Sequence, residues 1–190
     1  MSGQTWPPAW PVRLGGLELE LPLVTGEDGF RIYAFDPMGR AGWNRDAAQA
    51  LARRLAGYDF DILLTAESKA IALTQELARA LGQEDYVVLR KARKLYMADP
   101  MVMDVKSITT AAPQRFFLGR DQQDLLRGRR VCVVDDVLST GGTLRAIYAM
   151  AAKLPCAVAV NACVLTEETR WESFEGVPVV SLGHIPLPGY

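Results

Sequence analysis

Residues 131–143 hold the densest group of chemically active side chains in the sequence. Four apolar residues, Val131 to Val134, are typical of a buried strand, and the carboxylates Asp135 and Asp136 follow it directly. A turn rich in hydroxyl groups and glycines comes next and leads into a helix that begins near Leu144; its members are Ser139, Thr140, Gly141, Gly142 and Thr143.

Each part of this segment suits a sugar phosphate. Glycines allow close backbone approach, and the unpaired N–H groups at a helix start bind anions, so the turn predicts a phosphate site. The two carboxylates beside it suit a diol or a hydrated Mg²⁺. Together they predict a ribose 5-phosphate ligand. Ordinary turn formation is the plainer alternative. A P-loop ATPase is excluded, because the chain contains no Gly-Lys dipeptide.

The elements around this segment predict an α/β fold with a doubly wound, mostly parallel sheet flanked by helices. Apolar strand-like runs alternate with segments of helical spacing, which is typical of parallel sheets covered on both faces. Ligands of such sheets bind beyond the carboxyl ends of the strands. The expected strands are 17–24, 30–35, 60–65, 86–89, 131–134 and 157–165; the expected helices are 44–55 with Asn44 as its cap, 71–81, 122–126 and 144–154.

Length, charge and cysteine use narrow the class of protein further. The chain has 190 residues, enough for one domain, and 21 basic against 22 acidic side chains, so we expect no nucleic-acid partner. No apolar stretch is long enough to span a membrane, and the N-terminus does not resemble a signal peptide. Three cysteines and one histidine argue against a disulfide framework and a zinc site, and a reducing cytoplasm fits them best.

Residues 131–143 resemble the phosphoribosyl pyrophosphate (PRPP) signature of the type I phosphoribosyltransferases, and the similarity extends over about 44–165. It is nearest to the adenine and xanthine branches. The resemblance implies that Asp135 and Asp136 contact the ribose hydroxyls and that the turn binds the 5-phosphate. It also implies one domain over 1–190, with a core of about 41–165 and a small hood built from about 1–40 and 166–190.

Two further segments fit the pyrophosphate site of this family. One follows the strand 60–65 and comprises Ala66, Glu67, Ser68 and Lys69, although Ala70 stands where the family usually has glycine. The other is the basic run 90–94, in which Lys91 and Lys94 match the family pattern Arg-Lys-x-x-Lys. Cations beside a strand end suit a strongly anionic leaving group. A solvated charged face is the alternative for the basic run.

The irregular stretch of about 95–118 resembles the mobile loop of the family. Arms at 102–105 and 116–118 predict a hairpin, and Ser107, Ile108 and Thr109 lie at its tip. Thr109 stands where the adenine enzymes typically have a carboxylate. For the base, we expect Val137 and Leu138 to form its seat and Phe30 to stack on it.

The resemblance implies Mg²⁺-dependent transfer of phosphoribosyl from PRPP to a purine base. Adenine is favoured, with xanthine, hypoxanthine and guanine as alternatives. No direct protein ligand of the metal is predicted: PRPP would hold Mg²⁺, with waters reaching Asp135 and Asp136. A homodimer is expected from the family. The competing hypothesis is a PRPP-sensing regulator with the same fold, and the acidic balance and short N-terminal segment argue against a DNA-binding domain.

Overall fold

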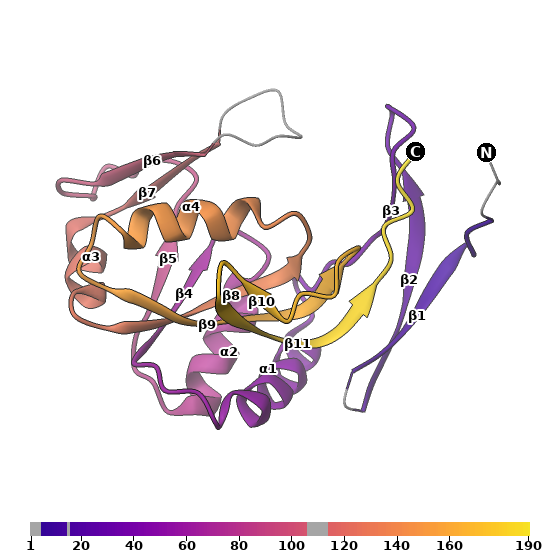
Figure 1. Cartoon of the computed structure of the whole chain (residues 1–190), viewed down its shortest axis with the longest axis horizontal. Coiled ribbons are helices and arrows are strands. Elements are labelled where there is room, and N and C mark those ends of the chain that lie inside the picture. Colours follow the sequence, from indigo (N-terminus) through magenta and orange to yellow (C-terminus); the bar gives the residue numbers. More distant parts are fainter. Residues whose placement is uncertain (1–4, 15, 106–113) are drawn as a thin grey trace.

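The computed structural model describes residues 5–14, 16–105 and 114–190 (Figure 1). The strands are β1 (Ala9–Leu14), β2 (Leu17–Thr25), β3 (Arg31–Tyr33), β4 (Ile62–Ala66), β5 (Tyr86–Leu89), β6 (Met101–Val105), β7 (Gln114–Leu118), β8 (Arg130–Leu138), β9 (Ala157–Glu167), β10 (Ser173–Phe174) and β11 (Val177–Ile185). The helices are α1 (Ala41–Leu55), α2 (Ile71–Leu81), α3 (Arg120–Leu126) and α4 (Gly142–Ala151).

A six-stranded sheet in the order β10-β11-β9-β8-β4-β5 forms the centre of the molecule. Five of its strands are parallel, and only the short edge strand β10 runs antiparallel. Numbered along the chain, the parallel strands lie in the order 2-1-3-4-5, so the order reverses between β4 and β8. Ligands of open α/β sheets bind at such a switch point. The predicted doubly wound fold is confirmed.

Helices cover both faces of this sheet. α1 and α2 pack side by side on one face, and α4 lies across the other (Figure 1). Two separate apolar cores result, one on each side of the sheet. α2 shows why the sequence folds this way: Leu73, Leu77 and Ala78 recur at helical spacing and are buried, and Gly82 ends the helix with a φ of 70°.

The expected cap of the first helix is wrong. α1 begins at Ala41, and Asn44 lies inside its first turn, where it is buried. Its side-chain amide donates to the carbonyls of Pro37 and Arg40, at 2.7 and 3.1 Å. Asn44 therefore stabilises the chain that enters the helix by satisfying carbonyls, and not by accepting from the first N–H groups as a cap does.

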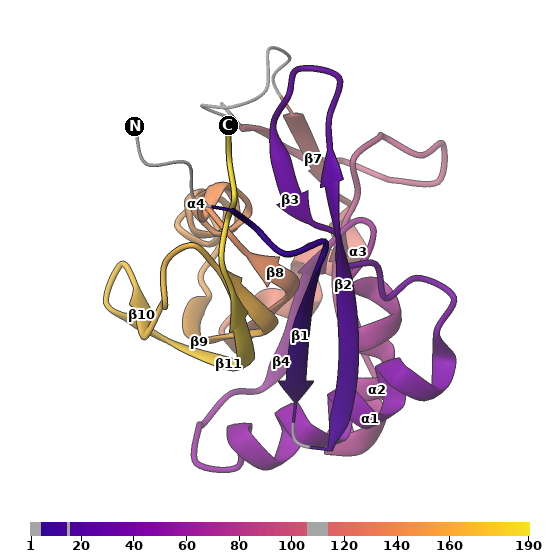
Figure 2. The ribbon, with the colours of Figure 1, turned by 90° about the vertical axis from the view of Figure 1, so that its right-hand side faces the viewer.

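The N-terminal strands form a separate three-stranded antiparallel sheet, β1-β2-β3, at one end of the molecule (Figure 2). Alternation of Leu and Glu in β2 buries one face of this sheet and exposes the other. The final residues of the chain join it, because Gly189 and Arg31 exchange backbone hydrogen bonds of 3.0 and 3.1 Å. Within the segment after 166, Val177–Ile185 enters the central sheet as β11.

The expected hairpin between 102 and 118 is present, as β6 pairs antiparallel with β7. Ser107, Ile108 and Thr109 lie outside the described residues. In the part of the chain that the structure describes, no helix has the length and apolar character needed to cross a membrane.

Candidate functional site

The acid pair lies where two neighbouring strands end at different heights. β8 stays paired with β9 as far as Leu138, but its pairing with β4 ends at Val134. Asp135 and Asp136 come directly after that step and are half-buried. The sequence predicted that they follow the strand. They instead belong to it, because β9 continues to pair with β8 beyond Val134. On the β4 side none of that strand's described residues pairs with them, and this side is the switch point, where ligands of open α/β sheets bind.

Asp135 is held in a setting that disfavours its charged form. Its Oδ1 atom accepts a hydrogen bond of 2.9 Å from the backbone N–H of Asp136. Burial, and after it the negative charge of Asp136, raise the pKa of Asp135 well above its ordinary value, while Lys91 opposes the shift. A ligand that brings hydroxyl donors or a cation would relieve the cost of ionising it.

The turn after the acid pair presents free amides. Gly141 has a φ of 76° and immediately precedes α4. Among the described residues, no acceptor takes the N–H groups of Gly141, Gly142 or Thr143. A side chain at 141 would be strained by that φ and would collide with the buried ring of Phe174. The predicted phosphate turn thus has the geometry that an anion requires.

Glu67 ties the loop after β4 to the basic run. Its Oε1 lies 2.6 Å from Nε of Arg90, and its Oε2 accepts a 2.6 Å hydrogen bond from the backbone N–H of Lys91. Glu67 also donates its own N–H to the carbonyl of Leu89 at 2.9 Å. Its carboxylate is therefore occupied by protein partners. Since an anionic ligand would be repelled by it, its structural role is to hold Lys91 at the end of β5.

The other members of this loop leave donors available. The Nζ atom of Lys69 donates to the carbonyl of Phe35 at 3.0 Å, so this side chain also contacts the segment before α1. In the described ranges, no acceptor takes the backbone N–H of Ser68 or Lys69. Ala66 is the buried last residue of β4. The peptide bond between Glu67 and Ser68 is cis.

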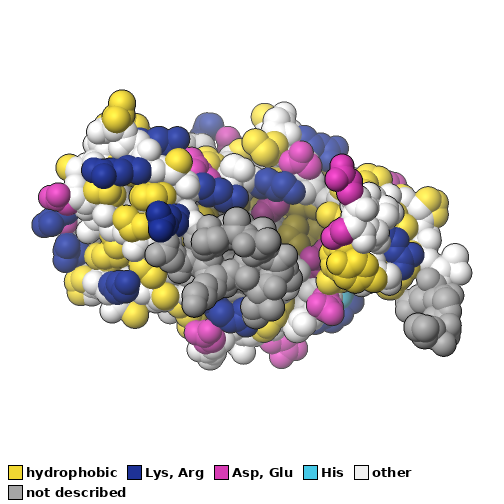
Figure 3. Space-filling model, turned by 90° about the horizontal axis from the view of Figure 1, so that it is seen from above, with side chains coloured by type: hydrophobic (Ala, Val, Ile, Leu, Met, Phe, Trp, Pro, Cys, Tyr) yellow, Lys and Arg dark blue, Asp and Glu magenta, His cyan; other side chains and the backbone are white. Residues whose placement is uncertain are grey.

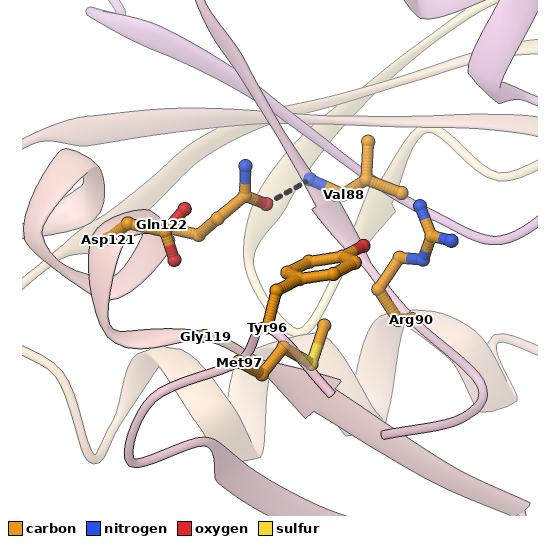
Figure 4. A pocket seen from close by; sticks show the side chains of 7 residues that line it. All are labelled: Val88, Arg90, Tyr96, Met97, Gly119, Asp121 and Gln122. Carbon is orange, nitrogen blue, oxygen red and sulfur yellow. Dashed lines mark hydrogen bonds between the residues drawn. The ribbon is translucent and has the colours of Figure 1, made fainter. Parts of the chain in front are cut away.

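The residues that follow the basic run, Tyr96 and Met97, line a small cavity (Figure 4). Met97 is buried there, Tyr96 is largely exposed, and Gln122 Oε1 accepts a 3.0 Å hydrogen bond from Val88 N–H on the outer edge of β5. The cavity measures about 140 Å³ and is lined by Val88, Arg90, Tyr96, Met97, Gly119, Asp121 and Gln122. β4 separates it from the acid pair, so it is not the same site. Lys91 is exposed and Lys94 is half-buried; both lie in the segment between Arg90, which Glu67 holds, and the buried Met97.

The residues expected to receive the base come from two parts of the structure. Val137 is half-buried and Leu138 is buried, both on β8. Phe30 lies on the hood, where its ring meets that of Tyr190 edge to face at 5.1 Å between centroids. The surface seen from above is hollowed between the core and the hood strands, with hydrophobic side chains at its floor (Figure 3). That hollow is a reasonable place for a planar apolar ligand.

Two aromatic residues that no sequence motif indicated stabilise the phosphate turn. The indole Nε1 of Trp171 donates to the carbonyl of Ser139 at 3.0 Å, and Phe174 packs beneath Gly141. Nearby, burial raises the pKa of Glu167, and a hydrogen bond from the Ser139 side chain opposes that shift. Both aromatic residues come from the segment around β10, whose position depends on long-range pairing. No local pattern could have predicted the contacts.

Two of the thiols are buried, and the acid pair offers oxygen atoms as donors to a metal. Cys132 and Cys163 are buried and unpaired, and burial raises the pKa of both thiols. No group of three or more His, Cys, Asp or Glu side chains able to hold a metal occurs in the described residues. Two carboxylates at the mouth of the sheet fit a Mg²⁺ ion that keeps most of its waters and ligand oxygens.

Comparison with known proteins assigns this chain to a family. The model of the phosphoribosyl transferase domain matches residues 41–177. The adenine phosphoribosyltransferase of Saccharopolyspora erythraea is 34% identical over 182 residues, which cover 90% of this chain and 95% of that protein.

Two solved structures share the fold. The adenine phosphoribosyltransferase of Thermoanaerobacter pseudethanolicus superposes with a TM-score of 0.70 at 22% identity, covering 87% of this chain and 95% of its own. The enzyme of Trypanosoma brucei, solved with AMP, pyrophosphate and ribose-5-phosphate, superposes with a TM-score of 0.60 at 18% identity, covering 74% of this chain and 64% of its own.

Fold and site together thus define an enzyme that transfers phosphoribosyl groups. The chain belongs to the phosphoribosyltransferase family. The expected resemblance to the adenine branch and the expected PRPP-dependent transfer to a base are both confirmed at this level.

Proposed function

We propose that this enzyme transfers the 5-phosphoribosyl group of PRPP to a ring nitrogen of a purine, with adenine as the favoured base and Mg²⁺ as cofactor. The products are the nucleoside 5′-monophosphate and pyrophosphate. The observation that carries the proposal is that the acid pair of β8 and the open amides of 141–143 follow one another at the switch point of the sheet.

Each part of PRPP has a partner of matching chemistry. The amides and hydroxyls of residues 139–143 bind the 5-phosphate at the start of α4. Asp135 and Asp136 accept hydrogen bonds from the ribose hydroxyls. The free N–H groups of Ser68 and Lys69, together with Lys91 and Lys94, bind the pyrophosphate. Ala66 and Glu67 contribute to that site by fixing the loop, through the end of β4 and through the contacts to Arg90 and Lys91.

The residues act mainly by positioning and by electrostatics. As the bond from C1′ to the pyrophosphate breaks, negative charge grows on the leaving group and positive charge on the ribose ring. Donors fixed around the pyrophosphate stabilise the first charge, and the acid pair on the other side of the ribose stabilises the second. Asp135 and Asp136 would hold a PRPP-bound Mg²⁺ through water, and the ion would neutralise part of the phosphate charge. The loop around Ser107, Ile108 and Thr109 would exclude water.

The base lies in the hollow between core and hood, against Val137 and Leu138 and within reach of Phe30. The names of the relatives support adenine. Xanthine, hypoxanthine and guanine stay as alternatives, because Thr109 stands where the adenine enzymes typically have a carboxylate. Division of the chain into a core of about 41–165 and a hood of about 1–40 and 166–190 belongs to the same proposal. The unpaired cysteines support a reducing cytoplasm as its location.

A homodimer completes the proposal. Leu95 is fully exposed and Tyr96 has 75% of its surface exposed, although both side chains are large and apolar or aromatic. Such residues mark contact surfaces. Light scattering should give twice the mass of 20.9 kDa for the wild type and a monomer for the Leu95→Glu, Tyr96→Glu variant. A dimeric variant would mean that the subunits contact elsewhere.

One assay tests the activity and the base together. Pyrophosphate release is followed with PRPP and Mg²⁺ and, in turn, adenine, hypoxanthine, guanine, xanthine, uracil and orotate. Rapid release with adenine alone supports the proposal, and preference for another purine corrects the base. No release with any base, together with tight PRPP binding, would favour the regulator that senses PRPP without catalysis.

A further inference from the structure

Two carbonyl groups of the phosphate turn are held from outside the turn. The carbonyl of Ser139 accepts the indole N–H of Trp171 at 3.0 Å, and the carbonyl of Thr140 accepts Nη1 of Arg145 at 2.9 Å. These are consecutive carbonyls, and both donors are side chains. The turn is therefore oriented by partners that a change of side chain can remove.

Holding these carbonyls determines where the next amides point. In a trans peptide unit the C=O and the following N–H point in opposite directions within one plane. A bond from Trp171 to the Ser139 carbonyl thus turns the N–H of Thr140 to the other side. The bond from Arg145 does the same for the N–H of Gly141. Both amides are then presented on the side away from the two donors, as an anion site requires.

An aromatic cluster keeps the two donors in place. The rings of Trp171 and Phe174 meet edge to face at 5.5 Å, and the guanidinium of Arg145 lies over the Phe174 ring at 5.3 Å. Phe174 is buried, and it fills the space beside Gly141 that a side chain would need. Since β10 carries this ring on the edge of the central sheet, the cluster is a rigid support for the turn.

We propose that Trp171 is a positioning residue for the 5-phosphate: its indole N–H orients the turn amides that bind this group. The inference rests on the proposed function, because it presumes that the turn binds the 5-phosphate of PRPP. It assigns Trp171 no contact with the reacting atoms, so its loss should weaken binding of the phosphate end and leave the bond-breaking step nearly unchanged.

Trp171→Phe isolates the hydrogen bond, because it keeps an aromatic ring against Phe174 and deletes the donor. Trp43→Phe is the matched control. Trp43 also packs edge to face on a phenylalanine, Phe35, at 5.2 Å, but its buried Nε1 has no partner among the described residues. The same chemical change there removes no hydrogen bond.

The experiment measures calorimetric binding of ribose 5-phosphate and of pyrophosphate, together with kcat and KM for PRPP. We expect Trp171→Phe to weaken ribose 5-phosphate binding and to raise KM by roughly 5- to 10-fold, the usual effect of one hydrogen bond. Pyrophosphate affinity and kcat should change less than twofold, and Trp43→Phe should resemble the wild type.

Two results would overturn the inference: unchanged ribose 5-phosphate binding in Trp171→Phe, or an equal loss for both ligands with a lower melting temperature, which would mean a structural role only. Failure of the proposed function looks different, since the wild type itself would then release no pyrophosphate with any base, whether or not it binds ribose 5-phosphate.

Discussion

The Oε2 atom of Glu67 accepts a 2.6 Å hydrogen bond from the backbone N–H of Lys91, which joins the loop after β4 to the basic run after β5. Both segments belong to the proposed pyrophosphate site. Their positions are therefore coupled through a carboxylate that itself has the wrong charge to bind the ligand.

Glu67→Ala should raise KM for PRPP about 10-fold with a smaller change in kcat, because charge-assisted hydrogen bonds of this kind contribute about 1.5–3 kcal/mol. Glu67→Gln keeps an acceptor for Lys91 and should recover part of the loss. Steady-state kinetics measure both, with Glu84→Ala as a control at an exposed position. An unchanged or lower KM in Glu67→Ala would show that its charge opposes the ligand more than its contacts help.

Replacing Lys91 and Lys94 by alanine should raise KM for PRPP by roughly 10- to 100-fold, since two charged contacts to the leaving group are lost. Arg93→Ala is the control, because Arg93 lies in the same run, is exposed, and is not assigned a contact. Kinetics and thermal melting are measured together. A lower melting temperature with unchanged PRPP kinetics would assign the lysines to folding alone.

Asp135→Asn should stabilise the protein at neutral pH by about 1 kcal/mol and abolish turnover. Residues at functional sites often lower stability in this way while they are needed for activity. Burial and the charge of Asp136 raise the pKa of Asp135, so the folded protein binds this proton more tightly than the unfolded chain. Wild-type stability therefore falls as pH rises from the ordinary pKa of Asp through the raised one.

Urea unfolding at a series of pH values checks this prediction. The difference in free energy of unfolding between Asp135→Asn and the wild type should grow with pH over that interval. If the variant is less stable than the wild type at pH 8, the Asp135 carboxylate is stabilised in the fold and the assigned environment is wrong.

Gly141→Ala should destabilise the protein by about 1–3 kcal/mol, because a side chain is strained at a φ of 76° and meets the Phe174 ring. PRPP binding should weaken with it. Gly57→Ala is the matched control, since no atom lies within 4 Å of a side-chain carbon there. Thermal melting and PRPP titration measure both; equal melting temperatures for the two variants would count against the strain.

The sequence was most informative where local pattern and tertiary structure agree. Residues 131–143 carry a buried strand, an acid pair and a glycine turn within one short stretch, and all three are present in the structure. α2 was also predicted correctly, from the helical spacing of its apolar residues and from Gly82 at its end. Such segments need no distant partner to define them.

The remainder depended on partners far along the chain. β11 contains Pro178 and Gly183 and alternates only weakly, so its pairing with β9 was not visible. β1, which contains Pro11, was likewise missed because β2 defines it. Trp171 contacts Ser139 across 32 positions, and that separation explains why the support of the turn became apparent only in the folded chain.

A crystal structure of the enzyme with ribose 5-phosphate and pyrophosphate tests the central claim most directly. We expect the 5-phosphate on the amides of residues 140–143, the ribose hydroxyls on Asp135 and Asp136, and the pyrophosphate between the loop at 67–69 and Lys91. Density for the sugar phosphate at any other place, with the acid pair unliganded, would contradict the account.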